Sequence, residues 1–327
     1  MPRQVFPYCL LSVVLCYTVY VSSIFIIKNE YHDKTLNFFL RRELGLSRRQ
    51  IASLKFRPEG LLLNGARCRV NALLRCGDRL EVGLDRGDPS KLLKGSCPPD
   101  LDVLYEDENV LAVGKPSGLV FHPAHGHYTD SLANRVAFYA AAKGDHFAVR
   151  PIGRLDKDTS GLALFAKSAE AAALLAKPGA VLKTYYALSE GIPAPPEGCV
   201  DLPIAADPAA LGKKCINSEG GAAQTYYKTE AVIKGRSGAV PEGTVPGLPG
   251  DCALLSVRIV HGRTHQIRLH LAHIGHPLVG DPLYGNGEKD KTHAMLHCRS
   301  AEIILPFSGK KIHVEAPFPE DWTAFLS

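Results

Sequence analysis

The sequence predicts an α/β protein of the α+β kind, in which a mixed, largely antiparallel sheet follows a small basic module. Three observations lead to this prediction. The chain has 327 residues, 46% of them hydrophobic, which is enough for two domains with real cores. From residue 101 onward, most apolar segments have the length and the alternation of strands. Ahead of them, residues 26–84 combine two short helical patterns with a hairpin signal.

The first 25 residues read as an apolar extension. Residues 8–27, YCLLSVVLCYTVYVSSIFII, are about as long as a membrane-spanning helix, with Arg3 before them and Lys28 after them. No small-residue cleavage site is obvious, so a signal peptide is not indicated. We interpret residues 1–25 as an extension from a mis-called start or as a disordered tail, with a membrane anchor as the alternative.

Residues 26–84 are predicted to form a module of two helices and a hairpin. Apolar residues recur at helical spacing from Thr35 onward, the pattern breaks at Gly45, and Ser47 is a natural N-cap for the second helix. An Asn-Gly pair inside LLLNGARCRV is the strongest short-range signal for a hairpin. The segment CGDRLEV then closes a small sheet.

The basic excess of the chain lies in this module. The formal net charge is +5, and residues 28–83 hold twelve Lys and Arg against six Asp and Glu. Arg48, Arg49 and Lys55 lie on the expected second helix. The motifs LSRRQI, LLNG and CGDRLEV, in that order, resemble the αL RNA-binding domain of the ribosomal protein S-four type, which implies that these cations bind RNA. The alternative is a solvated basic surface without a ligand.

A linker of residues 85–100, which contains Gly, Pro and Ser and few apolar anchors, is expected before a domain of residues 101–327. In that domain, VLYEDENVLAVGKPSG reads as a hairpin with an acidic turn, and four later segments have strand character. Residues 238–250 read as a flexible loop. Nine cysteines without a C-x-x-C pair favour neither a zinc ribbon nor a redox motif. They indicate a reducing compartment, and we expect the cytoplasm.

Residues 153–162, GRLDKDTSGL, place opposite charges side by side ahead of an apolar strand. The charged side chains are those of Arg154, Asp156, Lys157 and Asp158. The stretch is either a charged surface loop or a catalytic carboxylate held by basic neighbours. We interpret residues 159–161 as the turn that fixes Asp156 at the sheet edge, and Lys157 and Asp158 as solvent-facing neighbours.

Residues 261–285, HGRTHQIRLHLAHIGHPLVGDPLYG, hold five histidines within sixteen positions. His261 and His265 have the spacing of zinc ligands on a helix, but Gly262 opposes a helix there and adjacent arginines would repel a dication. We therefore expect packing and hydrogen bonding from these histidines. Thr264 is predicted to cap a short helix that carries Arg268 at the edge of its apolar face. A buried guanidinium needs a carboxylate, and Asp156 is the candidate.

Three motifs, GRLDKDTSGL, KTYYALSEG and GRTHQIRLHLAHIGHPLVGDPLYG, in that order, resemble the RluA-like family of RNA pseudouridine synthases. The resemblance spans about residues 101–322, and the basic module in front is a common companion in that family. It implies a pseudouridine synthase catalytic domain. Two positions depart from the pattern, because Gly153 stands where many members have His and Gly114 where many have Asn.

The resemblance also implies roles for individual residues. Asp156 matches the catalytic aspartate, and Arg154 matches an arginine that helps to displace the target base and takes its place in the RNA stack. Tyr185 matches a tyrosine that stacks on the uracil and assists proton removal. Arg268 matches the arginine that pairs with the catalytic aspartate, and Leu296 matches an apolar wall of the pocket. On a strand, Tyr185 would face the pocket with Lys183, and Tyr186 would face the core.

The implied activity is isomerisation of specific uridines in structured RNA to pseudouridine. The reaction breaks the bond from the ribose to uracil N1 and rejoins the sugar to C5, so we expect no cofactor and no metal. It needs an ionised carboxylate that attacks the nucleotide or removes a proton beside the sugar. We expect a monomer without a membrane partner, acting on ribosomal rather than transfer RNA. The alternatives are a non-catalytic RNA-binding assembly factor and a base-excising glycosidase, which would release free uracil.

Overall fold

A computed structural model of the chain describes residues 22–87, 93, 101–124, 126–145, 147–234, 250–285 and 293–326. Of these residues, 22–39 and 51–84 form one compact unit, here called the N-terminal unit. Residues 40–50 and 85–326 form the other, the C-terminal unit. Residues 1–21, most of the expected linker and residues 238–249 of the expected loop lie outside the described residues, so the predictions made for them stay predictions.

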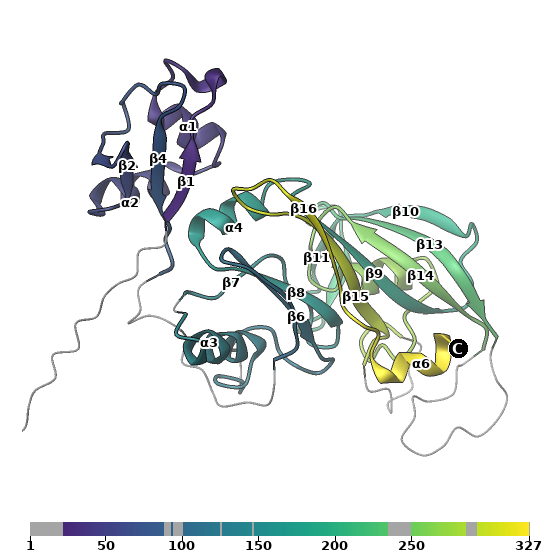
Figure 1. Cartoon of the computed structure of the whole chain (residues 1–327). Helices are drawn as coiled ribbons and strands as arrows, with labels where there is room; N and C mark the ends of the chain where they lie inside the picture. Colours follow the sequence, from purple (N-terminus) through teal and green to yellow (C-terminus); the bar gives the residue numbers. More distant parts are fainter. Residues whose placement is uncertain are drawn as a thin grey trace, which may run out of the picture. The chain divides into compact units, whose positions relative to one another are not determined.

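The N-terminal unit is built on a four-stranded sheet in the order β1-β4-β2-β3 (Figure 1). Its strands are β1 (Ser22–Ile26), β2 (Leu61–Leu63), β3 (Ala66–Arg67) and β4 (Arg79–Gly83), and the 3-10 helix η1 spans Asn29–Tyr31. The helices α1 (Leu36–Arg42) and α2 (Arg48–Phe56) run across the boundary between the two units. The expected boundary at residue 25 is wrong, because residues 22–25 belong to β1 and pair antiparallel with β4. The described residues include no helix that is both long and apolar enough to span a bilayer.

The helix cap and the hairpin turn that the sequence predicts in this region are both present. The Ser47 hydroxyl accepts a hydrogen bond from the Gln50 N–H (3.3 Å), and Gln50 Oε1 accepts one from the Ser47 N–H (2.9 Å), so Ser47 caps α2 in a capping box. Asn64 and Gly65 both have positive φ, 52° and 81°, as a tight two-residue turn between β2 and β3 requires. The predicted helix cap and hairpin are therefore confirmed.

Among the described residues of the C-terminal unit, ten strands form one sheet, with the path β10-β13-β14-β9-β15-β8-β6-β5 and with β16 on β15 and β7 on β8. Every neighbouring pair is antiparallel except β15 and β8. The mixed, largely antiparallel sheet is thus confirmed. The strands are β5 (Val103–Glu106), β6 (Val110–Lys115), β7 (Arg150–Pro151), β8 (Ser160–Ala166), β9 (Val181–Glu190), β10 (Glu197–Asp201), β13 (Gln224–Ile233), β14 (Cys252–Ile259), β15 (Leu296–Ile304) and β16 (Lys311–Glu315).

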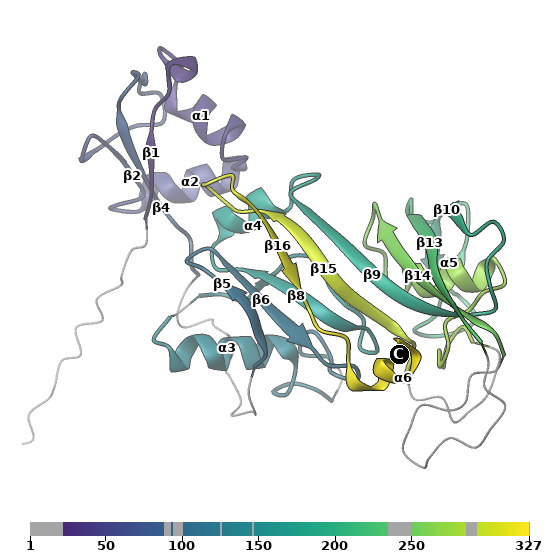
Figure 2. The ribbon, with the colours of Figure 1, turned by 45° about the vertical axis from the view of Figure 1, so that its right-hand side comes forward.

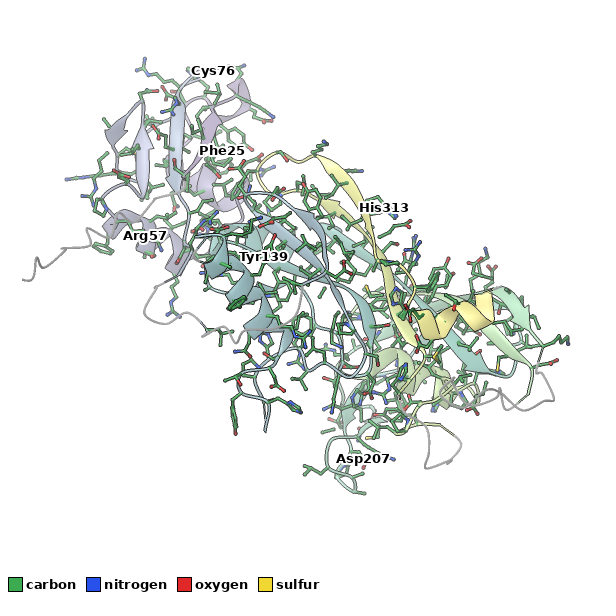
Figure 3. The ribbon with its side chains drawn as sticks, turned by 60° about the horizontal axis from the view of Figure 1, so that its bottom comes forward. Phe25, Arg57, Cys76, Tyr139, Asp207 and His313 are labelled. Carbon is green, nitrogen blue, oxygen red and sulfur yellow. The ribbon has the colours of Figure 1, made fainter. Side chains whose placement is uncertain are left out.

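Among the described residues, four helices lie wholly within this unit and are labelled in Figure 2. A small separate hairpin completes the unit. The helices are α3 (Leu132–Ala142), α4 (Ala169–Leu175), α5 (Gln266–His273) and α6 (Glu320–Leu326). The hairpin pairs β11 (Ile204–Ala206) with β12 (Lys214–Ile216), and its turn, which carries Asp207, projects from the rest of the unit (Figure 3). Tyr139 of α3 donates a hydrogen bond to Glu106 of β5 (2.7 Å), which ties this helix to the sheet edge (Figure 3).

The core of the C-terminal unit is centred on β8, which is buried along its whole length. Leu162, Leu164 and Phe165 pack in one cluster with α3 and with residues of β6 and β15. A strand buried on both faces reads as a continuous apolar run, which is what the segment LALFA shows. This buried strand is the fixed support for the loop that precedes it, residues 152–159.

Candidate active site

Side chains from four separate segments line one cleft in the C-terminal unit, with a volume of about 720 Å³. The sheet order explains how they meet, because β9 lies between β14 and β15, and β15 lies beside β8. The cleft is lined by Arg154 and Asp156 from the loop before β8, Lys183 and Tyr185 from β9, residues 259–268 around the start of α5, and Leu296 from β15. The four residues predicted for the pocket, and its predicted apolar wall, therefore lie together. Arg48, Arg49 and Lys55 do not line it; they are exposed on α2.

The loop that carries Asp156 is held by hydrogen bonds to its backbone. Lys115 Nζ donates to the carbonyl oxygens of Lys157 and Thr159, both at 2.8 Å, and to that of Pro116 at 3.0 Å. The Thr159 N–H donates to the Asp156 carbonyl (3.2 Å), so the turn spans residues 156–159. The prediction of a turn at residues 159–161 is wrong, because Ser160 and Gly161 already belong to β8.

Gly161 has a packing reason for being a glycine. Its φ is +103°, and a Cβ atom there would lie 2.3 Å from the Cys298 carbonyl oxygen of β15. The absence of a side chain lets the β8 backbone approach β15 closely. The small residues after Asp156 therefore serve the pairing of the two strands, which places the Asp156 loop beside β9 and β15.

Arg268 is buried, with 1% of its surface exposed, and its partner is not the predicted one. Its Nε and Nη2 donate to the two oxygens of Asp281 at 2.8 and 2.6 Å, and its Nη1 lies 3.5 Å from Asp158 Oδ2. The predicted ion pair with Asp156 is therefore wrong, and Asp158 is not a solvent-facing neighbour. Asp156 acts on Arg268 only at longer range, as one of the charges that raise the pKa of the guanidinium.

Asp281 is the residue that the sequence reasoning missed. Besides Arg268, its carboxylate accepts the N–H groups of Leu283 (2.8 Å) and Tyr284 (3.1 Å), and its side chain is fully buried. Burial would raise the pKa of Asp281, but the hydrogen bonds and charge of Arg268 outweigh burial and hold it below its usual value. The sequence did contain a signal for this residue. Asp281 is a carboxylate in the otherwise apolar segment LVGDPLYG, and it follows a few residues after the helix that carries Arg268.

Tyr185 and Tyr186 face opposite sides of β9, as predicted from strand alternation. Tyr185 lines the cleft, whereas Tyr186 packs edge-on against Phe318 with ring centroids 5.4 Å apart. Burial, then the neighbouring Cys298 and Asp156, raise the pKa of the Tyr185 hydroxyl well above its usual value. The shift favours the protonated phenol, which can donate a hydrogen bond.

Lys183 is a half-buried cation in the cleft. Its Nζ donates to the Ile152 carbonyl (3.3 Å), and burial lowers its pKa. No described carboxylate lies within ion-pair distance of it. Gly153 lies nearby with φ +69°, and its missing Cβ would be 3.7 Å from Lys183 Nζ. A histidine at position 153 would have to adopt this left-handed conformation.

Gly114, the other departure from the family pattern, lies outside the cleft. A Cβ atom at this position would be 2.1 Å from a carboxylate oxygen of Asp102, which occupies the space of a side chain. The Gly114 N–H also donates to the Asp102 carbonyl (2.8 Å). This glycine therefore reflects packing against residue 102 and not contact with a ligand in the cleft.

His265, His270 and His276 make side-chain hydrogen bonds, whereas His261 Nδ1 is buried without a hydrogen-bond partner among the described residues. His270 is buried between Thr225 Oγ1 (2.8 Å) and the Leu202 carbonyl (3.0 Å), and His276 donates to the Glu190 carbonyl (3.1 Å). In the part of the chain that the structure describes, no three His, Cys, Asp or Glu side chains cluster as metal ligands would. The predicted Thr264 cap is wrong: α5 begins at Gln266, and His265 occupies the N-cap position without a side-chain cap bond.

The buried Lys115 predicts a pH-dependent stability. Burial lowers its pKa from about 10.5 to about 7, although Asp158 and Asp156 oppose the shift. Between these two pH values the unfolded chain binds the extra proton, so the contribution of Lys115 to the free energy of unfolding rises from pH 7 to pH 10. We expect this rise in urea unfolding of the wild type and its absence in Lys115→Met, which lacks the titrating group. Parallel pH profiles for the two proteins would contradict the assignment.

The sequence and the fold were compared with those of known proteins. The profile of the family described as RNA pseudouridylate synthase matches residues 109–273, which include the Asp156 loop, β9 and α5. The C-terminal unit also resembles the solved structure of human RNA pseudouridylate synthase domain containing 1 (TM-score 0.52, 22% identity, 69% of this chain and 86% of that one), which supports the fold. The family match, which covers half of the chain, assigns it to the class of RNA pseudouridylate synthases.

Relatives with higher identity match most of the chain. The chain is 34% identical to the RNA pseudouridine synthase YhcT of Bacillus subtilis, over 77% of this chain and 79% of the relative. It is 36% identical to ribosomal large subunit pseudouridine synthase D of Zymomonas mobilis, over 68% and 70%. It is 32% identical to YjbO of Bacillus subtilis, over 87% and 95%. The chain belongs to the RNA pseudouridine synthase family and is an isomerase that converts uridine in RNA to pseudouridine.

Proposed function

We propose that the protein modifies uridines of large-subunit ribosomal RNA, with Asp156 as the catalytic carboxylate. The observation that carries the proposal is the charge of the cleft. Among the described residues that line the cleft, Asp156 is the one carboxylate. The basic residues of the lining include Arg154, Lys177, Lys183 and Arg263. Such a lining attracts a polyanion and leaves a single carboxylate to act on the ribose.

The hydrogen bonding of Asp156 supports this role. Its Oδ2 accepts the His265 N–H (3.2 Å), while Oδ1 has no protein hydrogen-bond partner among the described residues. One oxygen thus holds the carboxylate in place, and the other is free to reach the nucleotide. In the isomerisation the bond from C1′ to N1 breaks, the bond from C1′ to C5 forms, and C5 loses a proton while N1 gains one. The net reaction needs no oxidant, so the carboxylate chemistry is sufficient.

The neighbouring groups suit a uridine that has left its stack. Flipping a base out costs a few kcal/mol, and stacking on an aromatic ring returns about 1–3 kcal/mol. Tyr185 supplies that ring and keeps its proton, and exposed Arg154 at the rim can occupy the space that the base leaves. The exposed Arg48, Arg49 and Lys55 of α2 would provide a second contact with the RNA backbone, as in an αL-type module. A ribosomal substrate implies that the protein works in the cytoplasm.

The proposed preference for ribosomal RNA is supported by relatives named for the ribosomal large subunit, such as those of Zymomonas mobilis and Pseudomonas aeruginosa. The test is release of tritium from transcripts labelled at uridine C5, with large-subunit ribosomal RNA and transfer RNA as alternative substrates. We expect release from the ribosomal transcript, and pseudouridine at a defined position when the product is mapped. Release from transfer RNA alone would overturn the choice of substrate. Free uracil, or RNA binding without either product, would overturn the role of Asp156 as an isomerising carboxylate.

A further inference from the structure

His265 has a backbone conformation that a residue with a Cβ atom adopts only when neighbouring groups enforce it. Its φ and ψ are 58° and 18°, in the left-handed region, although it stands directly before the first turn of α5. For an L-residue other than glycine this conformation is disfavoured, and such strain is concentrated at functional sites. His265 makes no side-chain cap to α5, so capping does not explain the conformation.

The side chain of His265 is anchored by Tyr284. His265 Nδ1 lies 3.0 Å from the Tyr284 hydroxyl, and the two rings meet edge to face with centroids 5.7 Å apart. The same hydroxyl accepts the N–H of Lys214 at 2.8 Å, so its own proton is available for His265 Nδ1. This second bond comes from β12, in the hairpin whose turn carries Asp207 (Figure 3).

Tyr284 is itself held from the other side. Its N–H donates to Asp281 Oδ1 (3.1 Å), and the Arg268 guanidinium lies over its ring, 5.6 Å from the centroid. The buried Arg268–Asp281 pair therefore fixes Tyr284, and Tyr284 fixes His265. The chain of contacts ends at the His265 N–H, which is directed at Asp156 Oδ2 (3.2 Å). It is the one protein hydrogen bond to that carboxylate among the described residues.

We propose that His265 is a positioning residue: its left-handed backbone, locked by Tyr284, aims the Asp156 carboxylate at the ribose. This inference rests on the proposed role of Asp156. In this arrangement Arg268 does not pair directly with the Asp156 carboxylate. It helps to position that carboxylate through the successive contacts of Asp281, Tyr284 and His265. The imidazole serves to hold the backbone and does not itself need to contact the substrate.

The test separates the backbone of His265 from its side chain. His265→Gly and His265→Asn tolerate the left-handed conformation, whereas His265→Ala disfavours it, and all three keep the N–H. We expect kcat within about threefold of wild type for Gly and Asn and a fall of about tenfold or more for Ala. The loss in the Ala variant should appear in kcat rather than in KM, because the His265 N–H acts on Asp156 and not on the RNA.

Several outcomes would overturn the inference. Equal losses for Gly and Ala would show that the loss of the imidazole, and not the backbone conformation, lowers the rate, and an unimpaired Ala variant would show that the conformation is unimportant. Should His265→Ala fail to fold, Tyr284→Phe is compared with the double variant Tyr284→Phe/His265→Gly. We expect Tyr284→Phe to lose kcat and the double variant to resemble His265→Gly, and additive losses would contradict the proposed order of contacts. A wild-type protein without tritium release would contradict the proposed function instead.

Discussion

Asp156→Asn is expected to abolish pseudouridine formation, with a fall in single-turnover rate of at least about 10⁴-fold, as is typical when a reacting side chain is removed. Asparagine has the same shape, and its carbonyl oxygen can still accept the His265 N–H, so the loop should keep its place. What is lost is the carboxylate oxygen that we propose acts on the ribose. Tritium release from ribosomal transcripts measures the rate, and thermal unfolding measures the fold.

A matched control is available on the same unit. Asp201→Asn removes an exposed carboxylate of β10 that does not line the cleft, so both its activity and its melting temperature should match the wild type. RNA affinity of the Asp156→Asn protein should be retained, because removing a negative charge from a cationic cleft does not weaken its attraction for phosphate. Turnover by this variant within tenfold of wild type would rule out Asp156 as the catalytic carboxylate.

Arg268→Ala is expected to cost about 3–5 kcal/mol of unfolding free energy, because it leaves the fully buried Asp281 carboxylate without its cation. For a unit of this size the loss corresponds to a fall in melting temperature of roughly 6–20 °C. Activity should fall as well, since Arg268 supports Tyr284 and through it His265. Differential scanning calorimetry and single-turnover rates at a temperature where the variant is folded measure the two effects separately.

Two further variants identify the cause of the Arg268→Ala loss. Arg268→Ala/Asp281→Ala should lose less than the sum of the single losses, because removal of both partners leaves no buried charge unpaired. Arg154→Ala removes an exposed arginine of the same cleft and should change stability by no more than about 0.5 kcal/mol. An unchanged melting temperature for Arg268→Ala would contradict the burial of the Arg268–Asp281 pair.

Local physics made much of the structure predictable from the sequence. The alternation of β9 placed Tyr185 in the cleft and Tyr186 in the core, and the Asn64–Gly65 pair specified its hairpin. Each of these features depends on residues that are neighbours in the chain. No local sequence pattern indicates which strands pair. The grouping of cleft residues that are far apart in the sequence was therefore predicted only from the resemblance to the family.

The errors share a different cause. The partner of Arg268 depends on where the turn after α5 directs Asp281, and a choice between carboxylates 13 and 112 positions away needs the tertiary fold. The left-handed His265 has no sequence signal, since its conformation is imposed by Tyr284 and Asp156. Gly161 was predicted to lie in a turn. A glycine that allows two strands to approach closely cannot be distinguished in the sequence from one that allows the chain to reverse its direction.

The parallel contact between β8 and β15 has a consequence for how the catalytic centre forms during folding. It joins Ser160 to His297 and Gly161 to Cys298, and the Ser160 hydroxyl and His297 Nδ1 lie 2.9 Å apart. In the C-terminal unit, strands β5 to β8 and the loop with Asp156 lie on one side of this seam, and Tyr185 of β9 lies on the other. Joining strands so far apart in the chain has a high loop-closure cost, which makes such pairings slow. A nascent or half-folded chain therefore has no assembled reaction centre, and catalytic competence begins when the two halves of the sheet close.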